Sequence, residues 1–145
     1  MVKVVIVTGS VGTGKTTVAK RLAKKNKAKY LDVNKVIEDY KLCEGYDEKR
    51  KCEIIDVRKL SKVLIKIIKD SKEGLVIDSH MSHFLPPKYV DLCIVTKCGI
   101  KKLRNRLKKR GYSKDKIQEN VDAELFDVCL NEAKEIGHKI KVVYT

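Results

Sequence analysis

The sequence predicts an α/β fold built around a parallel β-sheet. Short runs rich in Val, Ile and Leu alternate with segments whose apolar residues recur every three or four positions. Strands and helices that alternate in this way form parallel sheets with right-handed crossovers. A glycine-rich loop between the first strand and the first helix is typical of the same class. The 145 residues are enough for one domain with a substantial core.

The first half of the chain is expected to supply two strands and two helices. Residues 2–8 form a continuous apolar run, which is typical of a strand buried on both faces. Helical spacing follows over 15–26, a short strand over 29–32 and a second helix over 33–42. Residues 43–53 are polar, so we expect a connection there, centred on Glu44-Gly45-Tyr46-Asp47.

The second half continues the alternation. Asp56 and Ser113 can each accept a hydrogen bond at the start of a helix. The expected elements are a helix over 57–68, strands at 75–78 and 89–96, helices over 99–110 and 113–136, and a last strand at 140–144.

The loop after the first strand has the spacing of a phosphate-binding loop. Residues 9–17 read Gly-Ser-Val-Gly-Thr-Gly-Lys-Thr-Thr, the pattern G-x-x-x-x-G-K-[ST]. Its glycines let backbone N–H groups converge on an anion, and the dipole of the next helix adds to that field. Lys15 can reach the β- and γ-phosphates of ATP, and the Thr16 hydroxyl can bind Mg²⁺. A glycine-rich turn without a ligand is the alternative, which the flanking strand and helix disfavour. The residues expected to bind ATP in this loop are Gly9, Gly12, Thr13, Gly14, Lys15, Thr16 and Thr17.

An aspartate at the tip of a later strand is the second candidate. Residues 74–80 read Gly-Leu-Val-Ile-Asp-Ser-His. Because parallel strands end at one edge of the sheet, Asp78 would lie beside the phosphate loop and hold Mg²⁺ directly or through water. His80 would project from the same side and could orient a water or a phosphate oxygen, with a pKa near neutrality. An ordinary turn aspartate and a surface histidine are the alternatives; His83 and His138 are expected to have no catalytic role.

The chain is strongly basic, with 33 Lys and Arg against 19 Asp and Glu and a net charge of +14. This charge implies anionic partners, which are nucleotide phosphates and potentially RNA. Residues 97–116 hold ten basic residues and one acid, Asp115. Arg106 and Arg110 fall on one face of a helix, where guanidinium groups could neutralise charge in phosphoryl transfer. With Gly111 as a hinge this segment predicts a short lid, and a solvated basic face is the alternative.

The composition also indicates the cellular compartment in which the protein works. The sequence has no apolar run long enough to span a membrane and no signal-peptide pattern within residues 1–14, so we expect a cytoplasmic protein. Its cysteines are spread out without a C-x-x-C pair, so we expect reduced thiols and no zinc site. They are Cys43, Cys52, Cys93, Cys98 and Cys129.

In combination these motifs resemble the adenylate kinase isoenzyme 6 family. The resemblance covers essentially the whole chain. It rests on residues 9–17, 44–47, 76–80 with Phe84-Leu85-Pro86, 106–112, and the helix with Asn120, Glu124, Leu125 and Phe126. It implies the P-loop NTPase fold of nucleoside monophosphate kinases, with a five-stranded parallel sheet in a single domain. It further implies a monophosphate-binding insertion at about 30–53 and a lid at about 105–115.

The resemblance also implies an activity. Members transfer a phosphoryl group between ATP and AMP or another nucleoside monophosphate, hydrolyse ATP, and act in late maturation of the small ribosomal subunit through a ribosomal protein. The chain would then be a monomer or a heterodimer with that protein, with pre-rRNA as a further partner. The family's Asp-x-His falls on Asp78 and His80, and its ATP-contacting arginine on Arg106. The expected catalytic residues are Lys15, Asp78, His80, Arg106 and Arg110, and the expected metal ligands are Thr16 and Asp78.

The sequence departs from the family at three places. Val11 stands where the family usually has proline. Glu38 stands where related adenylate kinases have an arginine that grips the AMP phosphate, and Arg50, Lys41 or Lys35 could substitute. Family members usually continue into a further C-terminal helix, so we expect a partner or a helix to cover one face of the sheet after the last strand.

Two alternatives to an AMP kinase therefore stay open. One is an ATPase that assembles a ribosomal protein, for which Glu44, Asp47, Glu48, Glu53 and Asp56 could form an acidic patch. The other, which the family resemblance disfavours, is a kinase with an alcohol as its acceptor.

Overall fold

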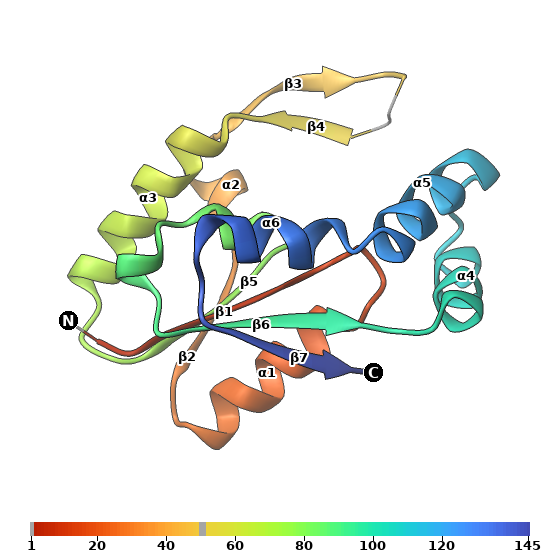
Figure 1. The fold of residues 1–145 in the computed structure, drawn as a ribbon. Coiled ribbons are helices and arrows are strands. Elements are labelled where there is room, and N and C mark those ends of the chain that lie inside the picture. Colours follow the sequence, from red (N-terminus) through yellow and green to blue (C-terminus); the bar gives the residue numbers. More distant parts are fainter. Residues whose placement is uncertain (1, 50–51) are drawn as a thin grey trace.

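The computed structural model describes residues 2–49 and 52–145 and contains a central sheet, a hairpin and six helices among them (Figure 1). The strands are β1 (Val4–Gly9), β2 (Lys29–Asp32), β3 (Cys43–Asp47), β4 (Cys52–Ile55), β5 (Leu75–Asp78), β6 (Leu92–Lys97) and β7 (Ile140–Tyr144). The helices are α1 (Lys15–Lys25), α2 (Val33–Asp39), α3 (Val57–Asp70), α4 (Ile100–Lys109), α5 (Lys114–Leu125) and α6 (Val128–Ile136). Short 3₁₀ turns lie at Ser82–Phe84 and Pro87–Tyr89.

The sheet confirms the predicted architecture. Its five strands are all parallel, in the order β2-β5-β1-β6-β7. The central strand β1 is buried along its whole length, as its continuous apolar run predicted. Val7 pairs with Asp78 of β5 on one side and with Ile94 of β6 on the other. This register brings the loop after β1 and the end of β5 to the same edge of the sheet.

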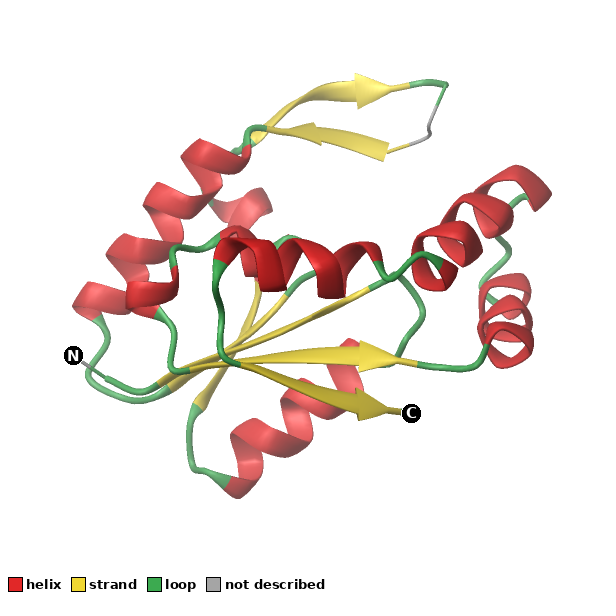
Figure 2. Cartoon of the chain, viewed as in Figure 1, coloured by secondary structure: helices red, strands yellow, loops and turns green. Residues whose placement is uncertain are grey.

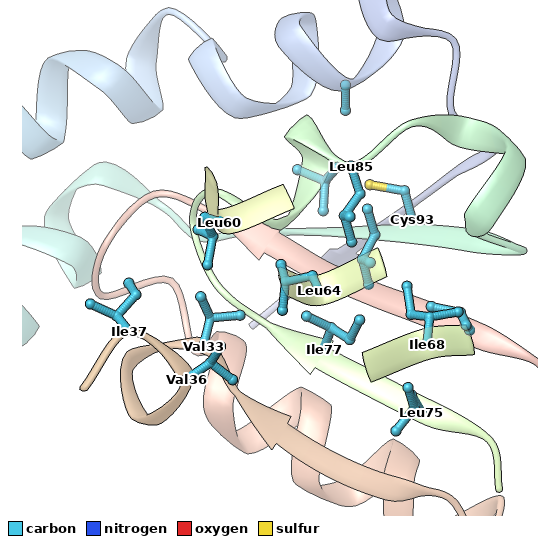
Figure 3. Close-up of a cluster of buried hydrophobic side chains, with 14 residues drawn as sticks. Val33, Val36, Ile37, Leu60, Leu64, Ile68, Leu75, Ile77, Leu85 and Cys93 are labelled. Carbon is cyan, nitrogen blue, oxygen red and sulfur yellow. The ribbon is translucent and has the colours of Figure 1, made fainter. Parts of the chain in front are cut away.

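Helices cover both faces of the sheet (Figure 2). Alternate residues of β1 point to opposite faces, so Ile6 and Val7 belong to different cores. Val7 packs with Ala19 and Ala23 of α1 on one face. The larger core, on the other face, joins α2, α3 and α6 to the sheet (Figure 3). Its best-buried members on α3 are Leu60, Leu64 and Ile68, at the spacing that predicted this helix.

Helices α4 and α5 form an arm that lies beyond the carboxyl ends of the strands (Figure 1). The arm has a small core of its own, in which Leu103 and Leu107 of α4 pack with Val121 of α5 and Cys98. Ser113 accepts a hydrogen bond from the Lys116 amide at the start of α5, and Asp56 accepts one from Arg58 at the start of α3. Both predicted helix caps are therefore confirmed.

Two predicted elements were wrong. The connection expected at 43–53 is an antiparallel hairpin of β3 and β4, in which Tyr46 pairs with Glu53. Its side chains are mostly exposed, so no apolar alternation marked it in the sequence. The single helix expected over 113–136 is broken between α5 and α6, because Asp127 adopts a left-handed backbone conformation with φ 53°. In the described part of the chain no helix is both long and apolar enough to cross a membrane.

Candidate functional site

The loop between β1 and α1 packs closely against β6 and the arm. A Cβ on Gly9, whose φ is 148°, would lie 2.4 Å from Oγ1 of Thr96 in β6. A Cβ on Gly12, whose φ is 89°, would lie 2.9 Å from a methyl carbon of Leu103 in the arm. Only glycine allows both approaches, because real Cβ contacts are essentially never this short.

One loop residue has a different role from the one its position suggested. The Thr13 side chain is fully buried and donates a hydrogen bond of 2.6 Å to the carbonyl oxygen of Ser10. Its hydroxyl also lies 2.7 Å from that of Thr96. Gly9 and the Thr13 side chain therefore shape the loop and do not line the cavity beside it, so that any contact of these two residues with a phosphate would come from the backbone.

A cavity of about 350 Å³ lies beside this loop. It gathers most of the residues predicted to bind or transfer phosphate, although they come from three separate parts of the chain. From the predicted set it is lined by Gly12, Gly14, Lys15, Thr16, Thr17, Asp78, His80 and Arg110. Asp32 and Asn34, at the junction of β2 and α2, complete its far wall.

The carboxylate of Asp78 is buried in this cavity and is held by hydroxyl groups. The Thr16 hydroxyl donates to Oδ2 of Asp78 over 2.8 Å, and the Tyr30 hydroxyl donates to the same oxygen over 2.6 Å. Across residues 2–49 and 52–145, no ammonium or guanidinium group pairs with Asp78. A buried carboxylate is costly without a compensating charge. Its oxygens, with the lone pairs of the Thr16 hydroxyl, are the hard ligands that Mg²⁺ prefers. The donor set therefore fits a magnesium ion.

Lys15 and His80 bring positive and titratable groups to the same cavity. The Lys15 ammonium donates a 3.1 Å hydrogen bond to the carbonyl oxygen of Ser10. Burial lowers the pKa of Lys15, while the charge of Asp78 opposes this shift. Both the loss of solvation in the cleft and the charge of Lys15 lower the pKa of His80, to about 4. The ring keeps contact with solvent, but it is neutral at neutral pH, so the predicted pKa near neutrality was wrong.

The two arginines of the predicted lid border one common cavity, and of the two Arg110 also borders the phosphate cavity. Arg110 borders the phosphate cavity and also a second cavity of about 460 Å³ on the other side of the loop. Arg106 borders the second cavity but not the phosphate cavity, and its guanidinium donates to the carbonyl oxygen of Gly12 over 3.2 Å and to the Thr145 hydroxyl over 3.0 Å. Of the predicted site residues, Arg106 is thus separated from the phosphate cavity by the loop itself.

His83 and His138 lie beneath the loop and not in the cavity. Nδ1 of His83 is 2.6 Å from the hydroxyl of Thr8, and its Nε2 is 3.2 Å from a carboxylate oxygen of Glu132. Nε2 of His138 is 2.8 Å from the carbonyl oxygen of His83. These contacts tie the segment after β5 to β1 and α6, which is a structural role.

Glu124 at the end of α5 has a positioning role that sequence reasoning missed. Its buried carboxylate accepts hydrogen bonds from the Cys98 amide (2.8 Å), the Lys97 ammonium (3.1 Å) and the Ser10 hydroxyl (3.3 Å). Lys97 also pairs with Asp127. One carboxylate thus joins the phosphate loop, the end of β6 and the arm. The motif that carried the family resemblance contained Glu124, but spacing alone does not reveal partners 26 and 114 residues away.

Comparisons with known proteins agree with this geometry. A family model described as an AAA domain matches residues 5–127. A provisionally named adenylate kinase of Methanocaldococcus jannaschii is 38% identical over 130 residues, which are 90% of this chain and 71% of that protein. An adenylate kinase isoenzyme 6 homologue of Caenorhabditis elegans is 36% identical over 131 residues, 90% of this chain and 72% of that protein.

Among solved structures, shikimate kinase from Acinetobacter baumannii in complex with shikimate aligns with 100% of this chain and 86% of its own, with a TM-score of 0.67. Its sequence identity of 14% makes this a likeness of fold alone.

We expect Glu124→Ala to lower the free energy of unfolding by about 3 kcal/mol, because it leaves the buried Cys98 amide without its acceptor and removes one of the two carboxylates that pair with Lys97. Urea denaturation measures this. Glu135→Ala is the matched control, since Glu135 is exposed on α6, and it should change stability by no more than about 0.5 kcal/mol. Equal losses in the two variants would contradict the assigned role of Glu124.

Proposed function

The chain belongs to the adenylate kinase isoenzyme 6 family of P-loop kinases, and we propose that it transfers the γ-phosphoryl group of ATP to AMP or another nucleoside monophosphate and slowly hydrolyses ATP. The observation that supports this most directly is the phosphate cavity. It combines a glycine-rich loop at a helix N-terminus, a lysine, and a buried aspartate with the ligand chemistry for magnesium.

The charged and polar groups around the loop have separate roles in this reaction. The loop amides and Lys15 hold the β- and γ-phosphates, and Arg110 stabilises charge on the transferred group. An oxygen of the acceptor phosphate attacks the γ-phosphorus, and the bond to the β–γ bridging oxygen breaks, so that ADP leaves with that electron pair. Magnesium, when bound by Thr16 and Asp78, supplies further neutralisation of phosphate charge. The cavity that Arg106 borders, on the far side of the loop, would take the nucleoside part of ATP.

The acceptor side of the cleft has the wrong charge for a tightly bound monophosphate. A cavity of about 640 Å³ between α2 and the hairpin meets the phosphate cavity at Asn34. Among the described residues, its charged lining consists of Glu38, Glu53 and one cation, Lys41. Lys35 is absent from this lining, and Arg50 lies outside the described residues. Weak AMP binding follows, because the carboxylate of Glu38 repels a phosphate.

This acidic lining favours a second candidate function. In it the chain is a cytoplasmic ATPase that handles a basic protein of the small ribosomal subunit, with little AMP kinase activity. The hairpin carries carboxylates that could meet such a protein, although Glu44 is paired with Lys59 over 2.9 Å and Asp56 caps α3. The exposed basic face of α4 would lie toward pre-rRNA in that assembly.

We expect Lys15→Ala and Asp78→Ala each to lower ATP turnover on the order of 10²-fold or more, because both side chains act on phosphate charge. The fold should persist, as measured by circular dichroism. A steady-state assay of ADP release tests this, with Lys24→Ala, an exposed lysine on the same helix, as the matched control. A folded Lys15→Ala protein with the parental rate would remove the proposed function.

We expect Glu38→Arg to lower the KM for AMP by about tenfold, because it replaces repulsion with a charge-assisted hydrogen bond. A coupled assay of ATP turnover with and without AMP measures it. Asp39→Arg makes the same charge change on the same helix outside the cavity lining, and it should leave KM unchanged. An AMP-independent rate in both the parent and Glu38→Arg would favour the ATPase.

We expect His80→Ala to reduce ATP hydrolysis in the absence of acceptor about tenfold or more, with little change in ATP affinity, because the ring is placed to orient water. Since the pKa of His80 is lowered to about 4, the parental profile should show no inflection from this residue near about pH 6.5. Unchanged hydrolysis in the variant would make His80 a bystander. An inflection near pH 6.5 that His80→Ala abolishes would contradict the lowered pKa.

A further inference from the structure

Tyr30 touches the metal-binding aspartate although it belongs to no phosphate-binding motif. It lies on β2, an edge strand, and the register pairs it with Val76 of β5, two residues before Asp78. From there the phenol reaches forward along the sheet. Its hydroxyl donates to Oδ2 of Asp78 over 2.6 Å, a distance typical of a hydrogen bond to a carboxylate.

The two donors to Asp78 converge on one oxygen. Thr16 donates to Oδ2 from the phosphate loop and Tyr30 donates to it from β2. A carboxylate rotates easily about its terminal torsion, so a single bond would leave its plane loosely defined. Two donors from different elements determine that plane. Oδ1 receives no hydrogen bond from the described residues, so it remains available as a ligand.

The phenol is itself held in place. Its ring lies 5.4 Å from the Lys20 ammonium on α1, within the range of a cation–π contact. Because a phenol titrates only near about pH 10, the hydroxyl keeps its proton through the physiological range and acts toward Asp78 as a donor.

We propose that Tyr30 is a positioning residue for the divalent-cation site, which holds the Asp78 carboxylate so that Oδ1 faces the cation. Tyr30 contacts neither the cation nor the nucleotide and acts only through Asp78. The inference rests on the proposed function, because it requires that the cavity bind a nucleotide together with a divalent cation. Partners that orient a metal ligand in this way typically contribute 10- to 100-fold to metal affinity, by the order of magnitude seen in other sites.

Calorimetric titration of ADP, once with Mg²⁺ and once with excess EDTA, tests the proposal. Tyr30→Phe removes one oxygen atom and keeps the ring, so it preserves packing. We expect it to weaken ADP binding about tenfold in the presence of Mg²⁺ and to leave binding in EDTA unchanged. Binding of Mn²⁺ to the ADP complex, followed by electron paramagnetic resonance, should weaken by the same factor.

Two further variants make the result specific. Tyr89→Phe is the matched control, since Tyr89 lies in a 3₁₀ turn outside both nucleotide cavities, and it should change neither titration. In an Asp78→Ala background, Tyr30→Phe should have no further effect on the Mg²⁺ dependence, because its action passes through that carboxylate.

The titrations distinguish a failure of the proposed function from a failure of the positioning role of Tyr30. A parent protein that binds no ADP with Mg²⁺ would overturn the proposed function. If the parent binds ADP, an unchanged Mg²⁺ dependence in Tyr30→Phe would overturn the positioning role alone. Equal weakening with Mg²⁺ and in EDTA would also overturn it, because the hydroxyl would then support only the fold.

Discussion

The site depends on the parallel pairing of β1 with β5 and β6. In this register Val7 lies between Asp78 and Ile94, so the loop after β1 leaves the sheet beside the carboxylate. The Ser79 amide donates to the carbonyl oxygen of Val7 over 3.1 Å and extends the pairing past the end of β5. Because β1 is buried on both faces, a shift in register would disrupt both cores. The distance between the loop and Asp78 is therefore set by a strand that is buried along its whole length.

The arm is joined to this centre by shape and by charge. Leu103 and Leu107 of α4 occupy the space that a side chain at Gly12 would need. Glu124 adds hydrogen bonds from the arm to Ser10 and to the end of β6. Packing and a buried carboxylate thus act on the same loop from one side. This arrangement brings Arg106 and Arg110 to the loop and makes the position of the arm depend on the conformation of the loop.

Charge divides the cleft into two unlike halves. On the loop side, burial lowers the pKa of Lys15 and of His80, while Asp78 has hydroxyl donors only among the described residues. A bound nucleotide with its cation would add phosphate oxygens beside Lys15 and a divalent cation beside Asp78. On the acceptor side, the charged groups that the structure describes are Glu38, Glu53 and Lys41. In the proposed function, these residues would give the protein a well-equipped site for a triphosphate next to a poor one for a monophosphate. This contrast is the physical reason why ATP hydrolysis remains a candidate function together with phosphoryl transfer to a monophosphate.

The sequence by itself determined what depends on local spacing. It indicated the phosphate loop, the apolar strand that ends at Asp78, the caps at Asp56 and Ser113, and the parallel sheet, because each follows from periodicity or from a short motif. Tertiary structure alone decided the partners that meet across the fold. Tyr30 and Glu124 reach residues 48 and 114 positions away, and no periodicity encodes such contacts. The break at Asp127 and the lowered pKa of His80 likewise come from surroundings, a contact with Lys97 and a desolvated cleft, that the local sequence does not contain.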